Sequence, residues 1–219
     1  MSIDDAASAR FLVVLDVDST LIHDEVIELL AEHAGSRSTV AEITERAMRG
    51  ELDFAQSLRE RVATLAGLNE TVFEEVAASI RVTDGVPELV DGVHAAGGLV
   101  GVVSGGFHEL VDALAVQLHL DRWRANRLEV VDGILTGRVS GDVVDAAAKE
   151  TALREWARDA GVPATRTVAI GDGANDLAMM AASGLSVAFC AKPAVRRGAK
   201  VAVDTRDLSQ VLPLLGLRG

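Results

Sequence analysis

The stretch VVLDVDSTLIHDE, residues 13–25, decides the fold of this chain. Its first residues are apolar and mostly β-branched, and the run ends at two aspartates, Asp16 and Asp18. Apolar character without alternation is typical of a strand that is covered on both faces, as in a parallel sheet with helices on each side. Two carboxylates at the end of such a strand repel one another, so the stretch also predicts a site where something neutralises them.

Further apolar runs with helical segments between them extend this pattern. They lie at 11–17, 99–105, 167–173, 186–191 and 201–205. These runs predict an α/β fold with a doubly wound, Rossmann-like core of parallel strands. Helix ends are also readable, because Pro87 suits the first turn of a helix that reaches residue 96, and Gly184 suits a left-handed cap after the helix before it.

The segment 21–83 is much longer than a single crossover between two parallel strands requires. It contains no convincing strand, and it holds 12 acidic and 6 basic residues. Apolar residues recur in it at helical spacing, namely Phe54, Leu58, Val62 and Leu65, then Val72, Phe73, Val76 and Ile80. We therefore expect an inserted helical cap over 21–83, carried by an α/β core formed by 1–20 and 84–219.

A smaller insertion is predicted at 128–141. Two alternating runs flank Asp132 and Gly133, and this dipeptide is a strong signal for a tight hairpin turn. We expect a small β-hairpin flap near one edge of the sheet.

Composition limits the class of protein. The 219 residues are 49% hydrophobic, which is enough for a substantial core. No apolar run reaches the roughly 18 residues that span a bilayer, and the start MSIDDAASAR is acidic rather than a basic leader, so we expect a soluble, cytoplasmic protein. The first predicted strand follows so early that we expect no N-terminal regulatory domain. A net charge of −12 argues against nucleic-acid and anionic-membrane partners.

Several residue types are interpreted as structural. A single cysteine, Cys190, excludes an intrachain disulfide and a thiolate metal cluster, and we expect a packed thiol. The five histidines lack the spacing of zinc ligands. The basic cluster at the C-terminal side is interpreted as a solvated helix face; it comprises Lys192, Arg196, Arg197 and Lys200.

Polar residues follow three of the predicted strands at their carboxyl ends. Asp16 and Asp18 follow the first, SGG at 104–106 the second, and GDGAND at 171–176 a later one. Because the carboxyl ends of parallel strands meet at one edge of a sheet, these residues are expected to converge there. Each motif alone is common in turns, but their joint placement predicts one site.

The chemistry of these residues suits a metal and a phosphate. Asp16, Asp18 and Asp172 would repel one another without a cation, and hard oxygen ligands suit Mg²⁺. Ser104 and the glycines after it offer a hydroxyl and unobstructed backbone N–H groups, which bind phosphate. Lys149, in the stretch DAAAKET, can supply a compensating positive charge.

In this order, DVDST at 16–20, SGG at 104–106, Lys149 and GDGANDL at 171–177 resemble the four motifs of the haloacid-dehalogenase-like phosphatase superfamily. The flanks DSTLIHDEVIELLAEHAG and RGELDFAQSLRERVATLAGL look most like the phosphoserine phosphatases of that superfamily. The resemblance implies that the substrate is the small molecule O-phosphoserine, hydrolysed to serine and phosphate in the last step of serine biosynthesis.

The resemblance also implies roles for the motif residues. Asp16 would attack phosphorus to form an aspartyl-phosphate, and Asp18 would protonate the leaving serine oxygen and then activate water. Mg²⁺ would be held by Asp16, the backbone carbonyl of Asp18, and Asp172. Ser104, Gly105 and Lys149 would bind the phosphoryl oxygens. Asn175 would contact the phosphate or its ligands, and Asp176 would orient Lys149 or the water shell of the metal.

Four residues are expected at the amino-acid end of the substrate. By the same resemblance, Glu25 would bind the ammonium group and Arg61 the carboxylate, with Phe54 and Met48 shielding the pocket. Without the resemblance, the preferred explanation of Arg61 is an ion pair with a nearby glutamate on its own helix.

Other functions remain open at this point. A related phosphatase, or an enzyme that passes the phosphoryl group to homoserine, would use the same motifs. A phosphoaccepting receiver domain has a similar acidic Mg²⁺ pocket, but it is shorter and has no cap. A dinucleotide-binding fold would show G-x-G-x-x-G after the first strand, where this chain has DVDST. Both a monomer and a homodimer are compatible with the sequence.

Overall fold

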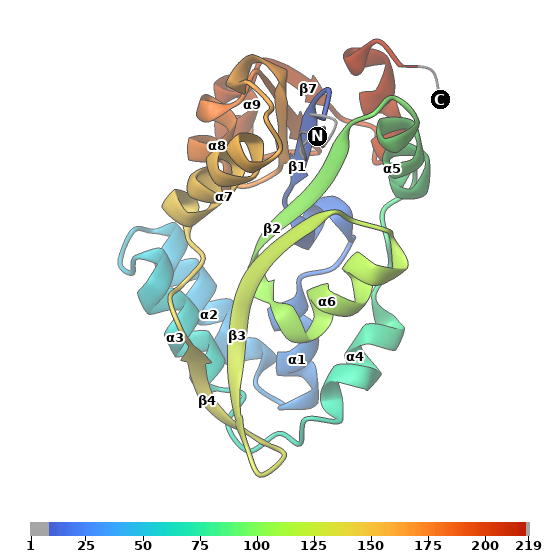
Figure 1. The fold of residues 1–219 in the computed structure, drawn as a ribbon. Coiled ribbons are helices and arrows are strands. Elements are labelled where there is room, and N and C mark those ends of the chain that lie inside the picture. Colours follow the sequence, from blue (N-terminus) through green and yellow to red (C-terminus); the bar gives the residue numbers. More distant parts are fainter. Residues whose placement is uncertain (1–8, 218–219) are drawn as a thin grey trace.

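A computed structural model describes residues 9–217, whereas residues 1–8, with most of the acidic start, and 218–219 lie outside the description. The chain forms a seven-stranded sheet in the order β4-β3-β2-β1-β5-β6-β7 (Figure 1). Neighbouring strands are parallel except for the antiparallel pair β3–β4, so the predicted α/β class is confirmed. The strands are β1 (Leu12–Leu15), β2 (Leu99–Phe107), β3 (Arg122–Val131), β4 (Ile134–Ser140), β5 (Thr167–Gly171), β6 (Leu185–Phe189) and β7 (Val201–Val203).

Strand β1 occupies the middle of the sheet. Leu15 is in register with Val102 on β2 and with Ile170 on β5, and all four residues of β1 are buried. The chain runs outward from β1 through β2 to β3 and then returns to β5 on the other side of β1. This reversal of strand order places the point where ligands bind in such sheets at the carboxyl end of β1.

Two helical layers cover the two faces of the sheet. Leu12 and Val14 face a buried cluster with Trp156 and Met179, on the side of α7 (Ala146–Asp159), α8 (Leu177–Ala182) and α9 (Pro193–Gly198). Val13 belongs to a larger cluster on the opposite face, with α5 (Val86–Ala95) and α6 (His108–Gln117). No helix within residues 9–217 combines the length and apolar character needed to cross a membrane.

The inserted segment folds into four helices, which occupy the lower half of Figure 1 beside the long hairpin β3–β4: α1 (Val26–His33), α2 (Arg37–Met48), α3 (Phe54–Ala63) and α4 (Val72–Ser79). The chain enters and leaves this layer side by side, because Ile22 and Val82 form an antiparallel bridge. Leu30 and Leu58 of the helices share one buried cluster with Val13 of the sheet. The helical content matches the expectation, while the division into a cap and a core domain at these boundaries stays a prediction.

The predicted hairpin is present and its turn has the expected geometry. Asp132 and Gly133 both have positive φ, 52° and 77°, as tight hairpin turns require. However, β3 begins at Arg122 and pairs in parallel with β2, so the hairpin prolongs the main sheet. It also contacts the helical layer, since the Gly67 N–H donates to the Leu135 carbonyl over 2.9 Å.

The two expected helix ends have different outcomes. Pro87 lies in the first turn of α5, as predicted. The left-handed cap at Gly184 was wrong, because α8 ends through Ser183 in an extended conformation and its hydroxyl donates to the Met180 carbonyl over 2.8 Å. A glycine is needed at 184 for another reason: a Cβ there would lie 2.4 Å from the backbone oxygen of Thr165.

Candidate active site

The turn after β1 presents two carboxylates at the edge of the sheet. Asp16 directly follows the strand, is 4% exposed, and its N–H donates to the Ile170 carbonyl over 2.9 Å. The next residues, Val17–Leu21, form a tight turn in which Ser19 has a positive φ of 56°. This turn brings Asp18 to the start of α1, where its Oδ1 accepts from the Val26 N–H over 2.9 Å.

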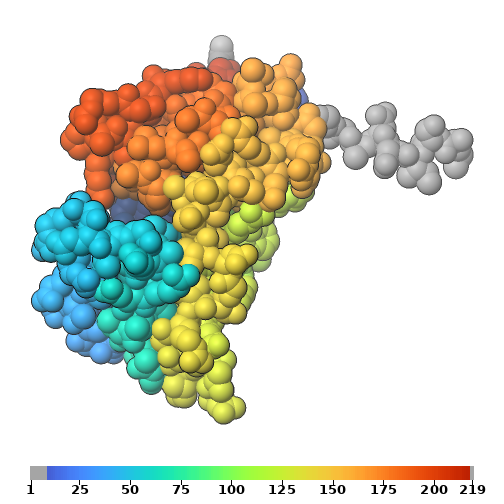
Figure 2. Space-filling model, turned by 90° about the vertical axis from the view of Figure 1, so that its left-hand side faces the viewer, coloured from blue at the N-terminus to red at the C-terminus, as the bar shows by residue number. Residues whose placement is uncertain are grey.

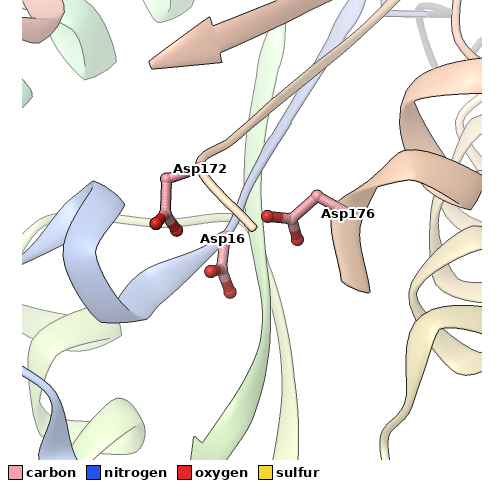
Figure 3. Close-up of side chains that lie close together, drawn as sticks. All are labelled: Asp16, Asp172 and Asp176. Carbon is pink, nitrogen blue, oxygen red and sulfur yellow. The ribbon is translucent and has the colours of Figure 1, made fainter. Parts of the chain in front are cut away.

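Three aspartates gather beside the end of β1 (Figure 3). Carboxylate oxygens of Asp16, Asp172 and Asp176 all lie within 4.8 Å of one another. Asp172 follows β5, and Asp176 ends the short 3-10 turn after it. Clustered carboxylate oxygens are the donor set that hard divalent cations prefer, so the site can hold a metal ion.

Lys149 reaches this cluster from α7 on the buried side. Its side chain is 0% exposed, and its Nζ contacts Oδ1 of Asp16 and, over 2.8 Å, Oδ1 of Asp176. The start of α7 is fixed because the Asp145 carboxylate accepts from the Ala148 N–H over 2.9 Å. The second oxygen of Asp176 accepts from the Gly173 N–H over 3.0 Å. Both Asp176 oxygens therefore have protein partners.

Burial, together with neighbouring carboxylates, raises the pKa of three aspartates at this site. Burial, and then Asp176, raise the pKa of Asp16 well above its usual range. Burial and the nearby Glu25 raise the pKa of Asp18 to about 7. Burial, with Asp176 and Glu25 adding, raises the pKa of Asp172 to about 6. A bound cation would relieve this repulsion, and a carboxyl group that titrates near neutral pH can both give and take a proton.

Ser104 and the two glycines after it form the wall opposite the cluster. The Ser104 hydroxyl is buried; it accepts from the Gly106 N–H over 2.7 Å and lies 3.3 Å from Oδ2 of Asp18. A Cβ on Gly105 would lie 2.8 Å from the Phe54 ring, and one on Gly106 would lie 2.9 Å from Oδ2 of Asp18. A side chain at either position would therefore displace Phe54 or Asp18 from its place in the site.

A pocket of about 150 Å³ joins these groups to the helical layer. Figure 2 shows the hollow between the cyan helices and the orange C-terminal segments, with dark blue atoms at its floor. Besides Asp16, Asp18, Asp172 and Asn175, the pocket is lined by Glu25, Phe54, Arg61 and Lys192, and also by Ile27, Leu58, Gly105, Gly106 and Gly173. The structure thus brings together residues from segments that lie far apart in the sequence.

The residues expected at the amino-acid end differ in where they lie. Glu25 is exposed and accepts a hydrogen bond from the Ser19 hydroxyl over 2.7 Å. Arg61 donates from Nε to the Ser57 carbonyl over 3.2 Å, and within residues 9–217 it forms no ion pair with a helical glutamate. Met48 ends α2, is 72% exposed, and is not among the residues that line the pocket.

Sequence reasoning missed two residues. Asn126 on β3 is fully buried and holds the glycine wall, because its Nδ2 donates to the Gly105 carbonyl over 2.8 Å. No local pattern marks it. Lys192 was interpreted as part of a solvated helix face, but it precedes α9 and lines the pocket. It follows a predicted strand at its carboxyl end, so the rule applied to the other three strands would have found it.

Comparisons with known proteins show the family of this chain. A family model described as haloacid dehalogenase-like hydrolase matches residues 13–181. Phosphoserine phosphatase of Streptococcus thermophilus is 53% identical over 209 residues, which are 95% of this chain and 97% of that protein. Phosphoserine phosphatase of Streptomyces coelicolor is 58% identical over 209 residues, but this chain spans only 51% of its length.

A solved structure of similar fold supports the same relationship. It is described as a phospho-aspartyl intermediate analogue of phosphoserine phosphatase, has a TM-score of 0.89 and 41% sequence identity, and the match covers 94% of this chain and 99% of that one. The resemblance to this superfamily is therefore confirmed along nearly the whole chain. The chain belongs to the haloacid dehalogenase-like hydrolases and, within them, to the phosphoserine phosphatase family.

Proposed function

We propose that this chain is a Mg²⁺-dependent phosphatase that hydrolyses O-phosphoserine to serine and phosphate. The observation that carries the proposal is the pocket itself. It is lined by the carboxylates of Asp16 and Asp18 and, from the helical layer, by an anionic and a cationic side chain, Glu25 and Arg61. This arrangement complements a phosphate ester that also carries an ammonium and a carboxylate group.

In the first step, a carboxylate oxygen of Asp16 attacks phosphorus while the bond between phosphorus and the serine oxygen breaks. Asp18 gives its proton to the departing serine oxygen, and its pKa of about 7 leaves a protonated fraction available near neutral pH. Lys149 holds the attacking carboxylate in place through its contact with Oδ1 of Asp16. The products are serine and an aspartyl-phosphate on Asp16.

In the second step, water attacks the phosphorus of the aspartyl-phosphate. Asp18, now ionised, takes a proton from this water, and the bond between phosphorus and Asp16 breaks. Phosphate leaves, and both aspartates return to their initial protonation states. Ser104, Gly105 and Asn175 would bind the phosphoryl oxygens during both steps.

The donor set at the cluster fits a divalent cation, which we propose is Mg²⁺. Asp16, Asp172 and the backbone carbonyl of Asp18 would hold it, and when bound it would neutralise negative charge on the phosphoryl oxygens. Asp176 would stay outside this ligand set, because its two oxygens already accept from Lys149 and from the Gly173 N–H.

At the amino-acid end, Glu25 would pair with the substrate ammonium and Arg61 with its carboxylate. Phe54 would cover the substrate from the side of α3, since its ring already lies against Gly105. A shielding role for Met48 would require the end of α2 to move toward the pocket, because this side chain is 72% exposed.

A panel of phosphate esters tests the proposal. With Mg²⁺ present, we expect phosphoserine to have the highest kcat/KM, to release serine and phosphate in equal amounts, and to lose turnover when EDTA is added. Hydrolysis of phosphoserine no faster than that of p-nitrophenyl phosphate would contradict the substrate. Formation of phosphohomoserine when homoserine is added would show that the chain transfers the phosphoryl group to an acceptor instead of to water.

A cytoplasmic location and a monomeric or homodimeric state belong to the same proposal. The first is supported by the sequence, in which no apolar run reaches the roughly 18 residues that span a bilayer. Cell fractionation and light scattering of the purified chain measure the two properties directly.

A further inference from the structure

Lys192 occupies a fixed place beside the acidic cluster. It follows β6, whose last residues are in register with β5 and β7. Its backbone N–H lies 3.3 Å from the Asp172 carbonyl, and its own carbonyl accepts from the N–H groups of Val195 and Arg196 over 3.0 and 3.1 Å at the start of α9. The main chain therefore holds Lys192 at the same edge of the sheet as the aspartates, although its side chain is exposed.

The three lysines of the sequence differ in what their ammonium groups bind. Lys149 is buried between Asp16 and Asp176, and Lys200 donates to the Gly184 carbonyl over 2.6 Å. Within the described range 9–217, the Lys192 ammonium takes part in no ion pair and no hydrogen bond, and the residue lines the pocket. Its charge is thus available to a ligand.

The pocket would otherwise be unfavourable for an anion. Four carboxylates line it, those of Asp16, Asp18, Glu25 and Asp172, against only two cationic side chains, Arg61 and Lys192. The whole chain carries a net charge of −12. A phosphate monoester carries close to two negative charges at neutral pH, so it needs positive charge at the entrance as well as at the buried end.

We infer that Lys192 is a further substrate-recognition residue, whose ammonium binds the phosphate dianion from the solvent side of the pocket. The phosphate is the expected partner because Lys192 lies on the sheet side, bonded to the Asp172 backbone, whereas Glu25 and Arg61 belong to the helical layer. This inference rests on the proposed function only in requiring that the substrate be a phosphate ester.

The test compares Lys192→Ala and Lys192→Arg with Arg197→Ala, which removes one positive charge from an exposed position on α9. The measurements are kcat/KM for phosphoserine and for phosphoethanolamine, which lacks the carboxylate, and the inhibition constant of inorganic phosphate. At low ionic strength, we expect Lys192→Ala to lower kcat/KM about fivefold on both substrates, mainly through KM, and to weaken phosphate inhibition similarly. We expect Lys192→Arg to keep most of the kcat/KM and of the phosphate inhibition. Arg197→Ala should change neither of these two quantities by more than about twofold.

Raising the salt concentration to about 0.5 M adds a second readout, because an exposed charge is screened there. We expect the difference in kcat/KM between the wild type and Lys192→Ala to become smaller at this salt concentration. Unchanged constants in Lys192→Ala, or losses equal to those of Arg197→Ala, overturn the inference, and a loss confined to phosphoserine assigns Lys192 to the carboxylate instead. A wild-type enzyme without preference for phosphoserine contradicts the proposed substrate, while phosphate inhibition still tests Lys192.

Discussion

The sheet side and the helical side of the site are held in different ways. At the sheet edge, Asp16 and Lys149 are 4% and 0% exposed, and each is tied to partners from other strands or helices. In the helical layer, Glu25 is exposed and Arg61 is half-buried, and within residues 9–217 each of these side chains takes part in one hydrogen bond. A rigid sheet edge suits a reaction that needs accurate placement of the attacking oxygen, while a helical layer suits recognition of a variable substrate group.

The comparison has an energetic side as well. Removing one member of the buried group leaves an uncompensated charge, and such changes are costly for both folding and activity. Removing a half-exposed recognition residue leaves groups that water can reach, so the fold tolerates the change. Substitutions on the sheet side should therefore lower activity and stability more than substitutions on the helical side.

Asp16→Asn should give the largest effect. An amide oxygen cannot serve as the nucleophile, so we expect kcat on phosphoserine to fall by at least about 10³-fold. Steady-state assays with Mg²⁺ measure the change. Asp142→Asn, the same substitution at an exposed position, serves as the control and should leave activity unchanged. Retained turnover in Asp16→Asn would exclude the covalent mechanism.

Lys149→Met should weaken both the fold and the activity. It removes the cation between Asp16 and Asp176, and breaking a buried ion pair typically lowers the free energy of unfolding by about 3 kcal/mol. Urea denaturation without metal measures this loss. Lys200→Met, at an exposed lysine, should change stability by less than about 0.5 kcal/mol. Equal stabilities for the two variants would show that the buried pair contributes nothing.

Arg61→Ala should affect recognition and leave the fold intact. We expect KM for phosphoserine to rise about tenfold or more with kcat little changed, because a charge-assisted contact to the substrate carboxylate is lost. Phosphoethanolamine should be hydrolysed almost as by the wild type. Arg59→Ala, two residues earlier and exposed, is the matched control. Similar losses on both substrates would make Arg61 a structural residue.

Asp18→Asn should give a smaller, pH-dependent effect on stability. The folded-state pKa of Asp18 is about 7 against 3.8 unfolded, so its contribution is fully favourable below 3.8 and is lost as the pH rises through 7. An asparagine has no such loss. We expect the Tm of the variant, relative to the wild type in EDTA, to be higher at pH 8 than at pH 5 by about 3–6 °C. A difference that does not change with pH would argue against the raised pKa.

The sequence predicted most of the sheet edge and less of what surrounds it. Apart from the first half of β3, the strands, the hairpin turn and the inserted helices follow from local patterns in the sequence, and the four motifs carry their own chemistry. Asn126, which holds the Gly105 carbonyl from 21 residues away, lies in a stretch without any local signal. At Gly184 the sequence predicted a left-handed helix cap. The glycine is needed instead because the backbone of Thr165, from an earlier segment of the chain, approaches it closely.

The sequence by itself determined that a central parallel strand ends in two acids and that three strand ends deliver acids, a hydroxyl and glycines to one edge. Only the tertiary structure decided which charges meet there. Lys149 pairs with Asp16, 133 residues before it. Lys192 lines the pocket, and its charge partly offsets the raised pKa of Asp172. The physical reason is that periodicity records which face of an element is buried, whereas the neighbours of a charged group depend on the register and order of strands distant in sequence.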